Sequence, residues 1–142
     1  MAGAAVGYRV RGAVDDVALS ALHDEAFGAP GPVLPWNHRL HQHSLTWVEA
    51  YGVDPASGGR LVGFVNVAWD GGVHAFLLDT CVAPDRQGEG IGAELVRRAV
   101  AAAADAGCDW LHVDFEPDLA GFYARCGFGP TRSGLMRLPT QG

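Results

Sequence analysis

The longest periodic pattern in the chain lies between residues 91 and 107. Apolar residues recur there at spacings of three and four, at Ile91, Leu95, Ala99, Ala102 and Ala106. This is the repeat of one face of a helix. Gly107 follows the last of them and offers the left-handed backbone conformation in which helices often end. The pattern therefore predicts a long helix with one buried face.

A nearly continuous apolar run, from Gly72 to Val82, comes before this helix. Such a run is typical of a strand that is covered on both faces. Between the strand and the helix the chain passes through Gly88, Gly90 and Gly92. Glycines carry no Cβ, so the free N–H groups at the helix start can approach a ligand closely. A helix start of this kind favours an anion, most naturally a phosphate.

The remaining patterns are shorter. They predict strands at 8–11, 45–51, 61–69 and 110–115, a helix that Asp15 or Asp16 caps and Gly28 ends, helices at 37–44 and 118–125, and a broken final pair of strands within 128–138. Residues 52–60 resemble a hairpin loop, so the second to fourth strands should form an antiparallel meander. The order β-α-α-β-β-β-α-β-α-β-β predicts a mixed sheet of the α/β class. A chain of 142 residues fits a single domain, residues 1–142.

The glycine spacing separates different kinds of phosphate loop. A dinucleotide-binding loop would need a third glycine where Ala93 stands, and an NTP-binding loop would need a lysine, which this chain lacks. The sequence Gln87-x-x-Gly90-x-Gly92 resembles the pyrophosphate loop of the GNAT superfamily of N-acetyltransferases. Taken alone, this loop is also compatible with a glycine-rich corner that binds nothing.

A second motif supports the resemblance. The stretch Phe122-Tyr123-Ala124-Arg125-Cys126-Gly127-Phe128 is similar to the Phe-Tyr-x-x-x-Gly-Phe motif of that family, and the element order agrees over essentially the whole chain. The resemblance implies a GNAT fold that transfers acetyl from acetyl-CoA, its cosubstrate, to the amine of a small molecule or peptide by direct attack on the thioester. The alternative is a catalytically silent acyl-CoA sensor on the same fold.

The resemblance also implies the site residues. Tyr123 would lie beside the CoA sulfur and act as the acid. The residues implied for binding the cosubstrate are Thr80, Cys81, Val82, Gln87, Gly88, Glu89, Gly90, Ile91, Gly92 and Ala93. The Thr80–Val82 strand would be splayed from the next one, so that pantetheine pairs with it. Many relatives have an asparagine where Glu116 stands, and a carboxylate there would repel phosphates, so that binding role is not assigned to Glu116.

The base that takes the proton from the amine stays open. The candidates on the two strands around the implied thioester are His74, Asp79, Asp114 and Glu116. Cys81 lies close to the same place, but the sequence shows no partner that would activate its thiol. Trp36, Trp47 and Trp69 either line a substrate pocket or pack in the core.

The composition of the chain indicates which classes of molecule it is expected to bind. The net charge is −6, and every one of the ten basic residues is an arginine, without a basic patch, so nucleic acid is not expected as a partner. The acidic balance either steers a cationic amine or serves solubility. Three histidines, at 38, 41 and 43, favour a polar helix face over a metal site, so no metal is expected.

No apolar run approaches the ~18 residues of a membrane span, and the first residues do not resemble a secretion signal. The three cysteines are odd in number and widely spaced, which indicates reduced thiols. We therefore expect a cytoplasmic protein with no membrane partner. A homodimer is possible by analogy with the family.

Overall fold

The computed structural model describes residues 5–53 and 59–140. Its elements, in chain order, are β1 (Val6–Val10), α1 (Asp16–Phe27), α2 (Trp36–His43), β2 (Ser44–Gly52), β3 (Arg60–Trp69), β4 (His74–Val82), the 3₁₀ turn Pro84–Arg86, α3 (Ile91–Asp105), β5 (Trp110–His112), the 3₁₀ turn Pro117–Leu119 and α4 (Ala120–Arg125). The strands form one five-stranded sheet in the order β1-β2-β3-β4-β5. Neighbours are antiparallel from β1 to β4, and β5 is parallel to β4.

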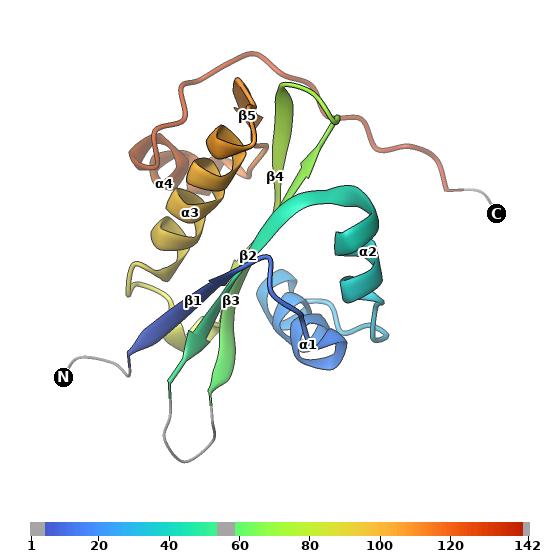
Figure 1. Ribbon diagram of the computed structural model, residues 1–142, viewed down its shortest axis with the longest axis vertical. Coiled ribbons are helices and arrows are strands. Elements are labelled where there is room, and N and C mark those ends of the chain that lie inside the picture. Colours follow the sequence, from blue (N-terminus) through green and yellow to red (C-terminus); the bar gives the residue numbers. More distant parts are fainter. Residues whose placement is uncertain (1–4, 54–58, 141–142) are drawn as a thin grey trace.

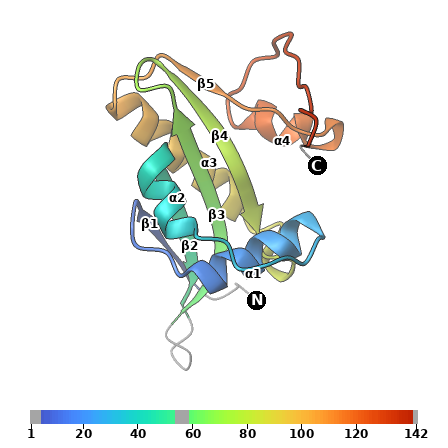
Figure 2. The same cartoon turned by 90° about the vertical axis from the view of Figure 1, so that its right-hand side faces the viewer.

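Helices cover both faces of this sheet. α3 lies on one face, and α1 and α2 lie on the other (Figures 1 and 2). The close approach of α3 depends on Gly63, because a Cβ there would lie 2.9 Å from the Leu95 side chain and 3.0 Å from that of Ile91. On the opposite face, the Trp36 ring of α2 packs edge-on against Phe64 of β3, with the ring centroids 5.6 Å apart. The core therefore has two layers, separated by β2, β3 and β4.

The predicted ends of α1 are confirmed. Asp15 caps α1, and its carboxylate accepts hydrogen bonds from the amides of Val17 and Ala18. Gly28 ends that helix in the left-handed conformation, with φ of 75°. Ile91, Leu95 and Ala99 of α3 are buried, as their spacing predicts, but Ala102 is only partly buried and Ala106 is exposed after the last residue of the helix. The antiparallel meander of β2, β3 and β4 is also confirmed.

The final pair of strands was predicted wrongly. Between residues 128 and 140 the described chain forms no strand, and Leu135 and Leu138 are 83% and 73% exposed. Pro130 and Pro139 lack the N–H that a ladder needs. The neighbouring strand β5 is also shorter than predicted, because it ends at His112 and offers a short edge for pairing.

Smaller boundaries differ as well. β1 begins at Val6 and ends at Val10, and Pro117 starts a 3₁₀ turn before α4. Residues 54–58 of the predicted hairpin loop lie outside the described residues. Among the helices that the structure describes, none has both the length and the apolar character that are needed to cross a membrane.

Candidate functional site

The open edge of β4 is the first feature of the site. β4 pairs with β5 only at His74, Ala75 and Phe76, although it continues to Val82. β5 ends at the partner of Phe76, and the chain after β5 leads away toward α4 (Figure 2). Within the described residues, the second half of β4 therefore has no strand beside it on this side, as the sequence resemblance implies.

A β-bulge interrupts the pairing of this half of β4 with β3. Phe64 pairs with Cys81 and Asn66 pairs with Leu78, so Asp79 and Thr80 both lie opposite the single residue Val65. Asp79 has φ of 58°, a left-handed conformation that few non-glycine residues adopt. Bulges turn backbone and side-chain groups away from the regular ladder and often lie beside active sites. Here the bulge directs one side chain toward α1 and its neighbour toward α4.

Tyr123 of α4 reaches the bulge from the α4 side. It is 6% exposed, and its ring contacts those of Phe115, Phe122 and Phe128 at centroid distances of 4.9, 4.9 and 5.7 Å. Burial raises the pKa of the phenol, although a side-chain hydrogen bond with Thr80 opposes the shift. The hydroxyl therefore keeps its proton at neutral pH and can donate it beside Thr80.

Cys81 follows the bulge and does not have the properties of a nucleophile. Its side chain is 5% exposed. Burial, and then the charge of Asp79, raises the pKa of the thiol to about 12. The reactive form of cysteine is the thiolate, so this environment favours direct transfer over an acyl-enzyme.

The glycine corner, residues 87–93, leads from β4 into α3. Gly88 and Gly90 are left-handed, with φ of 82° and 84°. Gly90 is the N-cap of α3, and no side chain caps the helix, so its first amides are available to an anion. At Gly92 a Cβ would lie 3.3 Å from the Phe122 ring, so this glycine allows α4 to approach α3. Gln87 instead donates a hydrogen bond to the Val82 carbonyl, at 3.3 Å.

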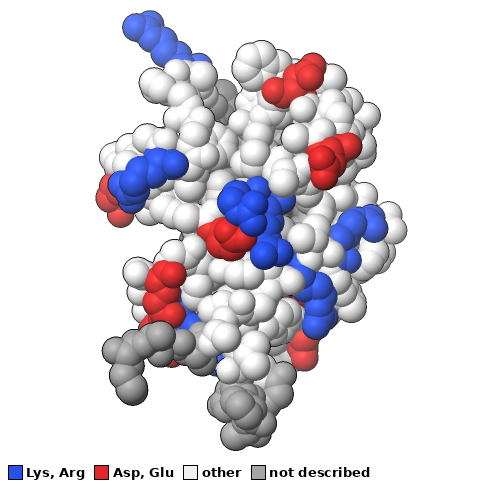
Figure 3. Space-filling view, turned by 60° about the vertical axis from the view of Figure 1, so that its left-hand side comes forward, with Lys and Arg blue, Asp and Glu red and all other residues white. Residues whose placement is uncertain are grey.

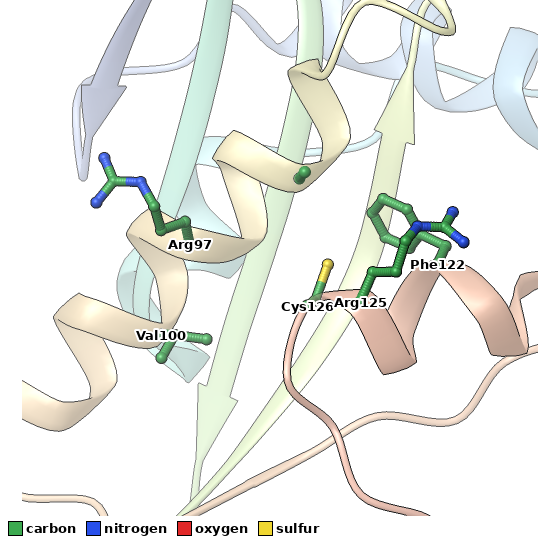
Figure 4. A pocket seen from close by; sticks show the side chains of 6 residues that line it. Arg97, Val100, Phe122, Arg125 and Cys126 are labelled. Carbon is green, nitrogen blue, oxygen red and sulfur yellow. The ribbon is translucent and has the colours of Figure 1, made fainter.

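A cleft of about 330 Å³ continues from this corner between α3 and α4. Figure 4 shows Phe122 and the Cys126 sulfur on the α4 side, facing α3. The lining residues are Ala93, Arg97, Val100, Phe122, Arg125 and Cys126. Arg97 is paired with Glu94, with Nη2 2.6 Å from Oε1. On the α3 side of the molecule, acidic and basic side chains are interspersed (Figure 3).

Among the predicted base candidates, Asp79 alone is at the bulge. Its Oδ1 lies 3.0 Å from Nε2 of His23 in α1, and its Oδ2 accepts a hydrogen bond from Asn66 Nδ2, at 3.2 Å. Ser44 Oγ in turn donates to Asn66 Oδ1, at 2.6 Å. The sequence prediction missed His23, because it lies 56 positions from Asp79 in an ordinary amphipathic helix.

The other candidates lie elsewhere. His74 Nδ1 is 2.9 Å from His112 Nε2, where β4 and β5 are paired. Asp114 and Glu116 are exposed in the segment after β5. In the part of the chain that the structure describes, no three histidine, cysteine or acidic side chains gather as metal ligands.

Two of the three tryptophans lie in the core. Trp36 and Trp47 are buried in the core, whereas Trp69 is 37% exposed. Trp36 also packs against His23, with the ring centroids 5.2 Å apart. Trp47 contacts the ring of His41, a residue from the histidine-rich helix. Core packing thus accounts for two of the three.

The sequence matches the family model described as acetyltransferase (GNAT) family over residues 17–128. It is 33% identical over 129 residues to serotonin N-acetyltransferase 2, chloroplastic, of Oryza sativa subsp. japonica, covering 88% of this chain and 63% of the rice protein. It is 38% identical over 74 residues to mycothiol acetyltransferase of Nocardia farcinica, covering 52% of this chain and 24% of that protein. The chain thus spans less than two thirds of the length of these curated relatives.

Solved structures show the same fold. An acetyltransferase of Trypanosoma brucei has a TM-score of 0.74 at 19% identity, covering 96% of this chain and all of the other. Glucosamine-6-phosphate N-acetyltransferase of Arabidopsis thaliana has a TM-score of 0.72 at 14% identity, covering 93% of this chain and 98% of the other.

Proposed function

The chain belongs to the acetyltransferase (GNAT) family, and we propose that it transfers the acetyl group of acetyl-CoA to the primary amine of a small molecule. The observation that carries this proposal is the bulge in the half of β4 that β5 leaves unpaired, with the protonated Tyr123 hydroxyl hydrogen-bonded beside it. A sensor needs the binding surface alone. A proton donor placed at the bulge is useful only to catalysis.

Two parts of the site would bind different parts of the cosubstrate: the glycine-rich corner before α3 and the open edge of β4. The amides from Gln87 to Ala93 would hold the pyrophosphate, because small residues and an uncapped helix start coincide there. The open edge of β4, at Thr80 to Val82, would hold the pantetheine arm and the thioester through backbone hydrogen bonds. The acetyl-CoA supplies an activated carbonyl carbon, and the protein supplies its orientation.

Acetyl transfer then needs three things of the protein. The amine must lose a proton, since an alkylammonium with a pKa near ~10.4 is free amine about once in a few thousand molecules at pH 7. Backbone N–H groups on β4 would stabilise the negative charge that develops on the carbonyl oxygen. When the C–N bond forms and the C–S bond breaks, the electron pair leaves on sulfur, and Tyr123 gives the thiolate its proton.

The surroundings favour an amine that carries an apolar group. Phe76 and Leu78 pair with Ala68 and Asn66 on β3. Paired residues share a face of the sheet, and Asn66 and Ala68 alternate with Phe64, which packs on α2. The two side chains therefore lie on the face that α1 and α2 cover. They are 38% and 39% exposed and lead to the bulge. The rice relative, which matches most of this chain, is named for serotonin, an aromatic amine. The net charge of −6 favours a cationic acceptor through long-range attraction.

Turnover on a panel of amines tests the proposal. The purified protein is incubated with acetyl-CoA and serotonin, tryptamine, glucosamine 6-phosphate or a peptide with a free N-terminus, and CoA release is followed with a thiol reagent. We expect release that depends on an amine, highest for the aromatic amines. Acetyl-CoA binding in calorimetry, without acetylation of any amine, would favour the silent sensor.

A further inference from the structure

His23 and Asp79 form a partly exposed pair on the acceptor side of the bulge. His23 lies on α1 and Asp79 on β4, with 3.0 Å between Nε2 and Oδ1, and their side chains are 26% and 21% exposed. The other oxygen of Asp79 accepts a hydrogen bond from the side-chain amide of Asn66, which in turn accepts one from the hydroxyl of Ser44. Three elements besides β4 therefore fix the direction in which the carboxylate and the imidazole point.

The hydrogen bond fixes the tautomer of the imidazole. An ionised carboxylate can only accept, so Nε2 of His23 must carry the proton that it shares with Asp79. In the neutral ring the lone pair is then on Nδ1. Across residues 5–53 and 59–140, no hydrogen-bond partner is found for Nδ1, and the buried side-chain atoms without a partner are Trp36 Nε1 and Glu49 Oε1. Nδ1 is therefore open to solvent as a proton acceptor.

His23 and Tyr123 contact neighbouring residues of β4 from opposite sides. Asp79 turns toward His23 on the α1 side, and Thr80, the next residue, is hydrogen-bonded to Tyr123 on the α4 side. Consecutive Cα atoms are only about 3.8 Å apart. A proton acceptor and a proton donor thus flank one short piece of backbone, which is the arrangement that an acyl transfer from thiol to amine needs.

We propose that His23 is the general base of the transfer and that Asp79 is its positioning residue. This inference rests on the proposed function. Nδ1 takes a proton from the ammonium group, and the freed nitrogen lone pair forms the C–N bond. Tyr123 gives a proton to the departing sulfur. The nitrogen loses its second proton as it becomes an amide, Tyr123 regains a proton from the nitrogen through solvent, and the proton on His23 leaves to solvent. The sum is one ammonium and one thioester converted to one amide, one thiol and one proton.

Other ionisable groups of the fold do not serve as well as a base. Glu49 is fully buried, and its Oε2 accepts a hydrogen bond from the hydroxyl of Tyr51, so it is closed to a substrate. The thiol of Cys81 keeps its proton, because burial raises its pKa. Around His23, the packed elements present the rings of Phe27 and Trp36, the carboxylate of Asp79, and the guanidinium of Arg39 on the Trp36 ring.

The variants His23→Gln and Asp79→Asn test the pair. Glutamine can keep the hydrogen bond to Asp79 while it removes the base. Asparagine tolerates the left-handed backbone of residue 79 while it removes the charge. We expect His23→Gln to lower kcat by about 10²-fold and Asp79→Asn by about 10-fold or more, with acetyl-CoA affinity unchanged. His38→Gln, an exposed histidine on α2, is the matched control and should retain full activity.

The pH profile distinguishes a base from a structural residue. With serotonin as the amine, kcat of the wild type should fall as the pH drops and the base gains its proton, and this acid limb should vanish in His23→Gln. A wild type that acetylates no amine overturns the proposed function and the pair with it. A kcat of His23→Gln that equals the wild-type value, or an acid limb that survives there, overturns the pair alone.

Discussion

The hydroxyl of Tyr123 can be removed without disturbing the packing around it. In Tyr123→Phe the ring contacts with Phe115, Phe122 and Phe128 remain, and the hydrogen bond with Thr80 is lost. A lost hydrogen bond of this kind costs about 1 kcal/mol of stability. The protein should therefore stay folded, and any large loss of rate belongs to the chemistry.

The expected size of that loss follows from the leaving group. General-acid catalysis typically contributes about 10²- to 10⁴-fold, and a thiol with a pKa near ~8.5 needs the least help. We expect kcat to fall about 10²-fold, equivalent to about 2.7 kcal/mol of transition-state stabilisation. Acetyl-CoA affinity should stay the same, because the hydroxyl is needed in the transition state and not in binding.

Pre-steady-state kinetics and calorimetry provide the assay. Single-turnover rates with a primary amine isolate the chemical step, and Thr80→Val is the control that removes the hydrogen-bond partner while leaving the phenol in place. That variant should lose less rate than Tyr123→Phe. If Tyr123→Phe stays within a factor of about two of the wild type in single turnovers, the reasoning is refuted and the proton comes from elsewhere.

Two further predictions concern binding and stability. Gly90→Val should weaken acetyl-CoA binding in calorimetry, whereas Gly71→Val, which has a similar backbone with φ of 80° and an open surrounding, should not; equal affinities in both would contradict the pyrophosphate assignment. Burial raises the pKa of Glu49, against the hydrogen bond from Tyr51 and the charge of Arg9. The folded state therefore holds this proton more tightly than the unfolded chain, so the free energy of unfolding should decline as pH rises above the ordinary glutamate pKa of ~4.3 and level off above the folded pKa. Denaturant titrations from acid to neutral pH should show a shallower decline in Glu49→Gln, and an identical slope in both proteins would refute this.

Much of the fold could be predicted, because its signals are local. The apolar spacing from Ile91 to Ala99 predicts the helix that contains these residues. Gly28 marks the end of the helix that comes directly before it. The final strands were overpredicted, because a strand depends on a partner that the sequence pattern does not supply. Leu135 and Leu138 have apolar side chains but no neighbouring ladder.

The candidate site could be predicted only on its cosubstrate side. The glycine corner and Tyr123 lie in contiguous motifs, which a sequence displays directly. The acceptor side depends on a bulge at Asp79, and an extra residue in one strand changes the side-chain alternation without leaving a sign in the pattern. His23 becomes visible as a partner only once α1 is folded against β4.

Acetyl transfer at the bulge of β4 is tested most directly by a crystal structure of the protein with acetyl-CoA and a non-reacting analogue of the amine. We predict the thioester carbonyl within hydrogen-bond distance of an amide between Thr80 and Val82, the sulfur beside the Tyr123 hydroxyl, and the amine nitrogen facing His23. A thioester held away from β4, or an acceptor that binds on the α3 side of the sheet, would contradict the proposed site.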